Sequence, residues 1–151
     1  EDHFAILKVG PGLTFAYREA LFALARIEDE WLTRPMDRPP SNLLASVLET
    51  MRAEPADWAA YYRGSPSEIE FSLKYSLSDR IRYYWLRQPL RGAVERLMYN
   101  LSSAPIPFSL LSQFLPEEYQ QVRAGVLENN PTALARARVR RVLQAYNAAC
   151  G

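Results

Sequence analysis

Hydrophobic residues along this chain follow two different patterns. Residues 3–9 form a short and almost continuous apolar run that ends in the Gly-Pro-Gly turn of residues 10–12. Such a run, bounded by turn residues, is typical of a strand that is buried on both faces, as in a parallel sheet. Thr14 then predicts the start of a helix that continues to about Leu32 and is apolar on more than one side. A strand, a tight loop and a buried helix make one βα unit, which cannot complete a sheet by itself.

Beyond residue 32 the apolar positions recur with helical spacing, and no second strand is predicted. The proline-rich residues 33–41 predict a loop. The expected fold class is therefore mostly α, with one N-terminal strand whose neighbours lie in another chain or in a missing part of a sheet. We expect helical segments over Asn42 to Arg52, Ala56–Tyr62, a stretch opened by a capping box of Ser67 and Glu70, Arg80–Trp85, Pro89 to about Leu101, Phe108–Phe114, Pro116 to a closing glycine at Gly125, and Asn130 to about Ala149.

Composition narrows the class of protein. The 151 residues are 48% hydrophobic and 23% charged, which suits a single domain with a buried core and excludes a disordered tail. A net charge of +1 argues against nucleic acid and membrane surfaces as partners. The sequence contains no apolar run of roughly 18 residues, so no membrane span is predicted. Cys150 has no second cysteine to pair with, so a disulfide scaffold is excluded and a cytoplasmic location is expected.

The residue types that bind metals or carry catalysis are scarce. A zinc site needs three or four His, Cys or carboxylate ligands, and this chain has one histidine and one cysteine that are far apart in sequence. We expect His3 to be structural or exposed, and Cys150 to lack an activating partner. The sequence therefore predicts no metal site and no catalytic residue in this chain.

The loop between the expected strand and helix is a candidate anion site. Backbone N–H groups at a helix N-terminus attract anions, and glycine allows the backbone to approach closely. Lys8, Gly10, Gly12 and Thr14 would contribute to such a phosphate site. The motif is neither a Walker loop nor a dinucleotide fingerprint, and Pro11 removes one donor, so a tight turn without a ligand is the competing interpretation.

The polar and aromatic residues 78–85 form a second candidate. Asp79, Arg80 and Arg82 would bind a phosphate or a partner carboxylate, because arginine suits bidentate contacts. In the competing interpretation, the segment is a capped helix whose arginines bridge to neighbouring carboxylates of the same chain. The side chains packed inward would then be Ile81, Tyr84 and Trp85.

Arginines also gather on the last expected helix. An apolar stripe on this helix is expected to pack inward, and its members are Ala135, Val139, Val142, Leu143 and Tyr146. The arginines opposite this stripe are interpreted as a solvated face rather than a binding patch. They are Arg136, Arg138, Arg140 and Arg141.

Several strings of the sequence are similar to one known family. They are His3 to Pro11, Leu13 to Ala16, Arg18 to Phe22, Ser78 to Trp85, Leu111 to Pro116 and Val122 to Gly125. Together they resemble the accessory, Z-type subunit of bacterial class II D-tagatose-1,6-bisphosphate aldolase, over nearly the whole chain. Gly12 departs from the alanine expected at that position in the family.

The resemblance implies that the chain is the C-terminal portion of a longer protein. Full members of the family form a (β/α)₈ TIM barrel. By the resemblance, residues 1–32 are the last barrel strand and its helix, and residues 33–151 are a helical C-terminal extension. The start at Glu1 without an initiator methionine agrees with this expectation.

The resemblance also implies a function. In the family, the Z subunit supports a catalytic Y subunit, which holds zinc and cleaves the sugar bisphosphate into dihydroxyacetone phosphate and glyceraldehyde 3-phosphate. The implied partner of this chain is that catalytic aldolase subunit, acting in galactitol or N-acetylgalactosamine breakdown, with no cofactor in the chain itself. Residues 8–14 are also similar to a phosphate-adjacent Lys-Val-Asn motif of catalytic class II aldolases, although Gly10 replaces the asparagine.

Two other functions stay open from the sequence. One is a sugar-phosphate-binding barrel protein with its own lyase or kinase-like activity, which would hold phosphate at residues 10–14 near Lys8. The other is a helical interaction module, which requires residues 33–151 to fold cooperatively without the strand. Self-association is open in each case.

Overall fold

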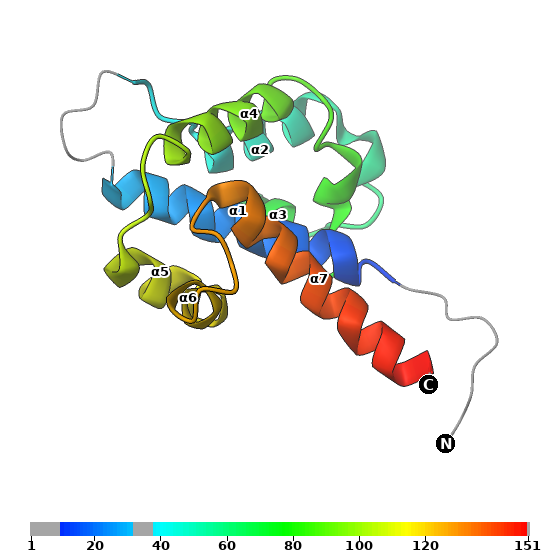
Figure 1. The fold of residues 1–151 in the computed structure, drawn as a ribbon. Coiled ribbons are helices and arrows are strands. Elements are labelled where there is room, and N and C mark those ends of the chain that lie inside the picture. The colour runs from blue at the N-terminus through cyan, green and yellow to red at the C-terminus, as the bar shows by residue number, and fades with distance from the viewer. Residues whose placement is uncertain (1–9, 32–37, 151) are drawn as a thin grey trace.

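The computed structural model describes residues 10–31 and 38–150, and every regular element within these ranges is helical (Figure 1). The mostly α prediction is therefore confirmed for the described part, whereas the expected strand, with His3 and Lys8, lies outside it. The elements are α1 (Gly12–Trp31), α2 (Leu43–Ala53), η1 (Pro55–Asp57), α3 (Pro66–Tyr75), η2 (Arg80–Tyr83), α4 (Leu90–Leu101), α5 (Phe108–Phe114), α6 (Pro116–Arg123) and α7 (Pro131–Cys150). The two η elements are short 3₁₀ helices.

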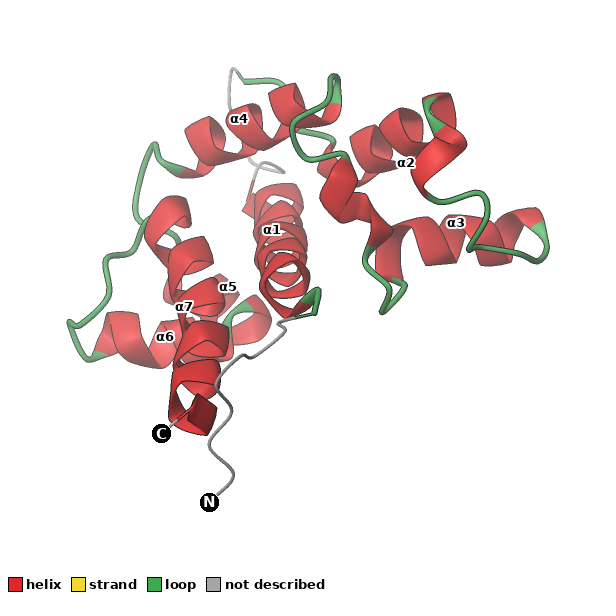
Figure 2. Cartoon of the chain, turned by 90° about the vertical axis from the view of Figure 1, so that its right-hand side faces the viewer, coloured by secondary structure: helices red, strands yellow, loops and turns green. Residues whose placement is uncertain are grey.

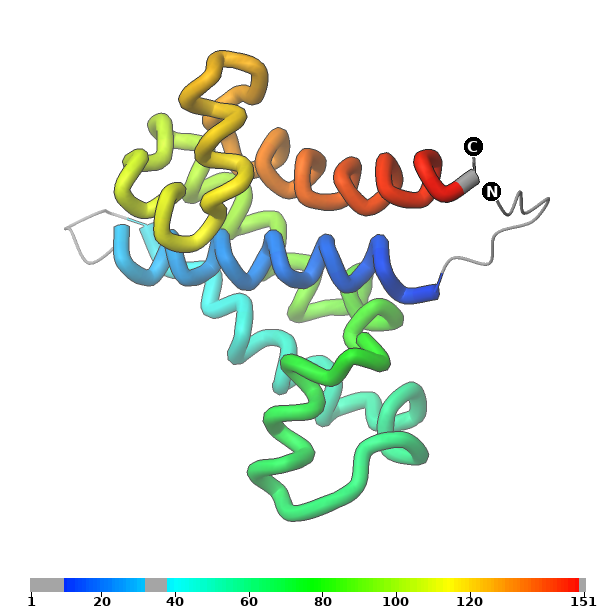
Figure 3. Tube along the Cα trace, turned by 90° about the horizontal axis from the view of Figure 1, so that it is seen from below, coloured from blue at the N-terminus to red at the C-terminus, as the bar shows by residue number. Residues whose placement is uncertain are grey.

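Helix α1 lies at the centre of the molecule (Figure 2). It packs against α2, α4, α5 and α7, and it runs beside α7 (Figure 3). A helix covered from several directions must be apolar on more than one side. This prediction is confirmed by the buried apolar residues of α1, which are Ala16, Ala20, Leu21, Leu24, Ala25 and Ile27.

The core around α1 is one connected cluster of buried side chains. Helix α2 contributes Val47 and Met51, and α4 contributes Leu97 and Leu101. Leu134, near the start of α7, belongs to the same cluster. Because these residues come from both ends of the described chain, burying them against α1 joins early and late helices into one unit.

Local cap signals were misplaced at two helix starts. Helix α1 begins at Gly12, two residues before the predicted Thr14, because Phe15 N–H donates to the carbonyl of Pro11 at 2.8 Å and closes the first turn there. The capping box predicted at Ser67 and Glu70 is formed instead by Ser65 and Glu68, since Pro66 already occupies the first position of α3.

Three other helix boundaries are predicted correctly. Helix α5 has the predicted bounds, Phe108–Phe114. Gly125 follows the end of α6 with a φ of 73°, as expected of a glycine that closes a helix. Asn130 caps α7, because its Oδ1 accepts from the N–H of Ala133 at 2.8 Å. The segment Ala56–Tyr62 is helical only over η1, and turns follow it.

A buried carboxylate ties α1 to α4. Glu28 is 1% exposed and accepts hydrogen bonds from Ser41, both from its N–H at 3.1 Å and from its hydroxyl. Asn100 Nδ2 donates to the same carboxylate at 2.7 Å. These donors satisfy the charge that Glu28 brings into the core, so the polar cluster fixes how α4 crosses α1.

Candidate functional site

A small hollow at the start of α1 brings together residues from both predicted anion sites. Gly10, Pro11, Leu13, Thr14 and Arg82 line a space of about 390 Å³. The first N–H groups of a helix have no partner within it, and the helix dipole adds positive charge at this end. The guanidinium of Arg82 therefore adds to a region that already favours anions. Lys8, the remaining predicted member, lies outside the described residues.

Thr14 and Gly12 have local roles beside this hollow. The Thr14 hydroxyl donates to the carbonyl of Pro11 at 3.0 Å, so it does not accept from the helix as an N-cap would. A Cβ added at Gly12 would overlap the hydroxyl of Tyr146 and lie 3.6 Å from Cγ1 of Val142. The missing side chain at Gly12 thus allows α7 to approach the first turn of α1.

Asp79 is buried by an ion pair and is closed to solvent. Its side chain is 0% exposed, and Arg18 Nη1 lies 3.0 Å from its Oδ1. The carboxylate oxygens have no hydrogen-bond partner among the described residues, so the attraction between the two groups is Coulombic. The same Arg18 nitrogen donates to the carbonyl of Ser76 at 2.8 Å. Asp79 therefore neither caps η2 nor faces a ligand; it anchors η2 to α1.

Arg80 and Arg82 contact carbonyls and aromatic rings. The guanidinium of Arg80 lies 3.2 Å from the ring centroid of Tyr61 and donates to the carbonyl of Asp57 at 3.3 Å. Arg82 donates to the carbonyl of Asp79 at 3.2 Å and to the hydroxyl of Tyr83 at 2.8 Å. Among the described residues these two arginines contact carbonyls and rings rather than the predicted carboxylates.

The inward packing predicted for this segment is confirmed. Ile81, Tyr84 and Trp85 are all buried. The Tyr84 hydroxyl donates to the carbonyl of Glu54 at 2.6 Å, and burial is the main cause that raises the pKa of Tyr84. Trp85 meets the ring of Tyr17 edge to face, with centroids 5.4 Å apart. The segment 78–85 is thus chiefly a packing element, and Arg82 is its member that lines the hollow.

The arginines of α7 divide into two pairs, and only Arg138, whose side chain is 16% exposed, departs from the predicted solvated face. Arg138 Nε and Nη2 donate to the two oxygens of Glu118 at 2.9 and 2.8 Å, and that carboxylate is 1% exposed. Arg141 pairs with Glu117. Helix α6 supplies both carboxylates, which local sequence patterns do not align with α7. Arg136 and Arg140 are exposed.

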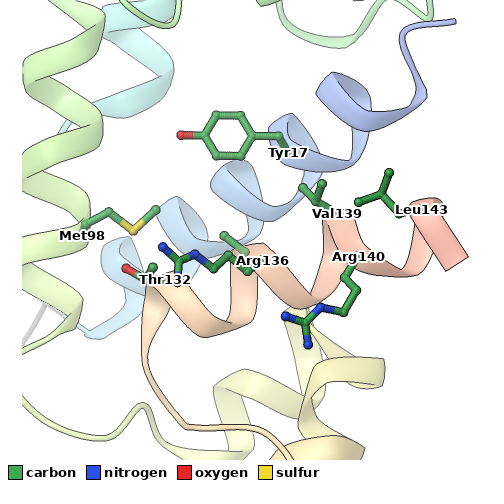
Figure 4. A pocket seen from close by; sticks show the side chains of 8 residues that line it. Tyr17, Met98, Thr132, Arg136, Val139, Arg140 and Leu143 are labelled. Atoms are coloured by element: carbon green, nitrogen blue, oxygen red, sulfur yellow. The ribbon is translucent and has the colours of Figure 1, made fainter. Parts of the chain in front are cut away.

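A second concavity lies between α1, α4 and α7, and sequence reasoning did not find it. This groove of about 420 Å³ is shown in Figure 4. The apolar stripe of α7 is the sequence feature that could have indicated this groove. One of its members, Leu143, is 44% exposed instead of packing inward as predicted. Its opposite wall comes from helices far away in sequence, and burial raises the pKa of Tyr17 there. The lining residues are Tyr17, Met98, Thr132, Ala135, Arg136, Val139, Arg140 and Leu143.

Two kinds of feature are absent from the described residues. Within residues 10–31 and 38–149 no group of three or more His, Cys, Asp or Glu side chains could hold a metal ion. No described helix is both long enough and apolar enough to cross a bilayer.

Comparison with known proteins identifies the family of this helical chain. The model of the family described as D-tagatose-1,6-bisphosphate aldolase subunit GatZ/KbaZ-like matches residues 1–151. The chain therefore belongs to this family, and the resemblance noted in its sequence is confirmed.

Individual relatives agree with the family. The D-tagatose-1,6-bisphosphate aldolase subunit GatZ of Shigella flexneri is 46% identical over 149 residues, which are 99% of this chain and 35% of the relative. GatZ of Escherichia coli strain SE11 has the same identity and coverage. The crystal structure of a probable tagatose 6 phosphate kinase from Sinorhizobium meliloti 1021 superposes with a TM-score of 0.87 and 47% identity over 97% of this chain and 37% of that one. The chain thus spans about a third of the length of the relatives it matches.

Proposed function

We propose that this chain is the C-terminal region of a non-catalytic subunit that stabilises and activates the zinc-bearing subunit of a class II D-tagatose-1,6-bisphosphate aldolase. The identity of 46% with GatZ subunits over 99% of the chain carries this proposal. Residues 1–32 are then the last strand and helix of a (β/α)₈ barrel, and residues 33–151 are its helical extension. We place the protein in the cytoplasm, where a lone cysteine stays reduced.

The retro-aldol step belongs to the partner subunit in this proposal. Zinc bound in that subunit would supply a Lewis acid for the substrate carbonyl. The described residues of this chain offer no ligand set for zinc, so no step of the cleavage is assigned to them. Their contribution is a surface for contact, held in place by the packing of α1 against four other helices.

Co-purification with the catalytic subunit tests this function. The complete gene product is mixed with the catalytic subunit, and complex formation, the Tm of the catalytic subunit and its aldolase activity are measured. We expect a stable complex, a higher Tm and a higher activity than the catalytic subunit has alone. If the two proteins neither bind nor stabilise one another, the proposed function is wrong.

The hollow at the start of α1 supports a second candidate function, the binding of a sugar phosphate. The observation that favours it is the meeting of Thr14 and Arg82 around one space at a helix N-terminus. Titration with inorganic phosphate, followed by backbone amide shifts of Leu13 and Thr14, tests it. We expect saturable shifts that Arg82→Ala weakens and Arg63→Ala leaves unchanged. Amide shifts that stay constant throughout the titration would count against a site there.

A further inference from the structure

The groove between α1, α4 and α7, here named the α7 groove, has an apolar floor. Ala135, Val139 and Leu143 recur every four residues along α7 and line the groove together with Tyr17 and Met98. Figure 4 shows Val139 and Leu143 on the side of α7 that faces α1. Eight residues of an α-helix rise by about 12 Å, which matches two turns of a second helix. Leu143 is 44% exposed, so the groove leaves apolar surface uncovered.

The rim of the α7 groove is positively charged and has no acidic residue. Arg136 and Arg140 lie one turn apart on α7, and within the described part of the chain neither has an ion pair or a hydrogen bond. Arg138 and Arg141 of the same helix are, in contrast, occupied by carboxylates of α6. The two rim arginines are therefore available to carboxylates from outside the described chain.

The α7 groove also offers a neutral donor. Tyr17 lines it from α1 and carries a phenol hydroxyl, which can donate a hydrogen bond. Burial raises the pKa of Tyr17, so the phenol keeps its proton at neutral pH. One hydroxyl and two guanidinium groups around an apolar floor are complementary to an occupant that is apolar along one side and carries carboxylates at its edge.

We propose that the α7 groove docks an amphipathic helix whose apolar stripe is flanked by Asp or Glu residues. This inference rests on the proposed function, because it assigns that acidic helix to the catalytic aldolase subunit. Helices bind apolar grooves through residues repeated at i, i+4 and i+7, and carboxylates one turn apart on such a helix would reach both Arg136 and Arg140. Arginine is enriched at protein interfaces for this kind of contact.

Charge reversal in the complete gene product tests the docking surface. The variant Arg136→Glu/Arg140→Glu is compared with the control Arg63→Glu/Arg96→Glu, which makes the same charge change at two exposed arginines outside the groove. We expect the Kd for the catalytic subunit to rise about ten-fold or more in the groove variant and to stay unchanged in the control. Thermal melts establish that both variants fold.

A photo-crosslinking amino acid in place of Leu143 identifies the occupant. We expect crosslinks to an acidic helix of the catalytic subunit, and we expect reversal of two carboxylates on that helix to restore binding to Arg136→Glu/Arg140→Glu. Crosslinks within the same chain or to a second copy would overturn the inference. Equal binding by the wild type and both variants would overturn it as well, while leaving the proposed function intact. A wild type that does not bind at all would remove the proposed function, and the inference with it.

Discussion

Arg18 and Asp79 bury opposite charges between α1 and the turn that opens η2. Their side chains are 5% and 0% exposed, and their closest atoms are 3.0 Å apart. Removing two charges from water costs several kcal/mol per ion, which the mutual attraction offsets only while both are present. The pair therefore acts as an anchor whose two halves depend on each other.

Asp79→Ala should destabilise the chain strongly. The change leaves Arg18 buried without its counter-charge, and we expect a loss of about 3 kcal/mol in the free energy of unfolding, measured by urea denaturation. Glu95→Ala is the matched control, because Glu95 pairs with Arg91 at 2.9 Å on the surface. That loss should stay below about 0.5 kcal/mol. Similar losses in the two variants would contradict the anchoring role.

Gly12→Ala should change sign with the residue at position 146. In the wild type the new methyl group overlaps the hydroxyl of Tyr146, and we expect a destabilisation of about 1 kcal/mol. In a Tyr146→Phe background that overlap is gone, and alanine should be neutral or stabilising because it favours the helix. A double-mutant cycle by thermal denaturation measures the coupling, and additive effects would show that the two residues do not compete for space.

At the residue scale the sequence identified the chemistry of single side chains but not their partners. Asp79 was predicted to contact an anion or a partner, whereas it is buried against Arg18 of α1, sixty-one positions earlier in the printed sequence. Tyr17 and Met98 were missed in the groove for the same reason, since each comes from a different helix. Contacts of this kind depend on how helices cross, which local patterns do not encode.

At the scale of single helices, side-chain capping was predicted correctly at Asn130 and wrongly at Ser67. Pro131 and Gly125 mark a helix start and a helix end as expected, because their backbone preferences act locally. Capping by Ser or Thr depends on which of several nearby hydroxyls the chain turns toward. Helix α3 used Ser65 where Ser67 was predicted.

Ser65→Ala and Ser67→Ala separate these two capping residues. Ser65→Ala removes the hydroxyl that accepts from the N–H of Glu68, and we expect a loss of about 1 kcal/mol in unfolding free energy. Ser67→Ala should cost little, because Ser67 caps nothing. Equal losses from the two serine variants would contradict the assignment of Ser65 as the cap.

Hydrogen bonds from Ser65 lower the pKa of Glu68 in the folded chain. The stabilisation from Glu68 should thus be complete above the ordinary glutamate pKa and be lost as the pH falls through the lowered value.

At the scale of the whole molecule, α1 connects the parts. The predicted division at residue 32 stays a prediction. Described helices on both sides of residue 32 contribute to one core. Helices of residues 38–150 surround α1 and share one core with it. The barrel that the resemblance implies could not be derived from this chain, because a strand is defined by neighbours that its own sequence does not contain.

Removing residues 1–32 should prevent cooperative folding of the rest. Without α1, residues 33–151 lose the surface against which Val47, Leu97 and Leu134 are buried. We expect a broad, non-cooperative thermal transition by circular dichroism, compared with a sharp one for residues 1–151. A sharp transition in the shorter chain would revive the helical interaction module as a function.

The central position of α1 also affects synthesis on the ribosome. Helix α1 is complete once residue 31 has been added, whereas α7, which packs beside it, begins at residue 131. At about 5–20 residues per second, roughly 5–20 s separate the two events. A nascent chain arrested before residue 131 should therefore leave uncovered the side of α1 that α7 covers in the complete fold.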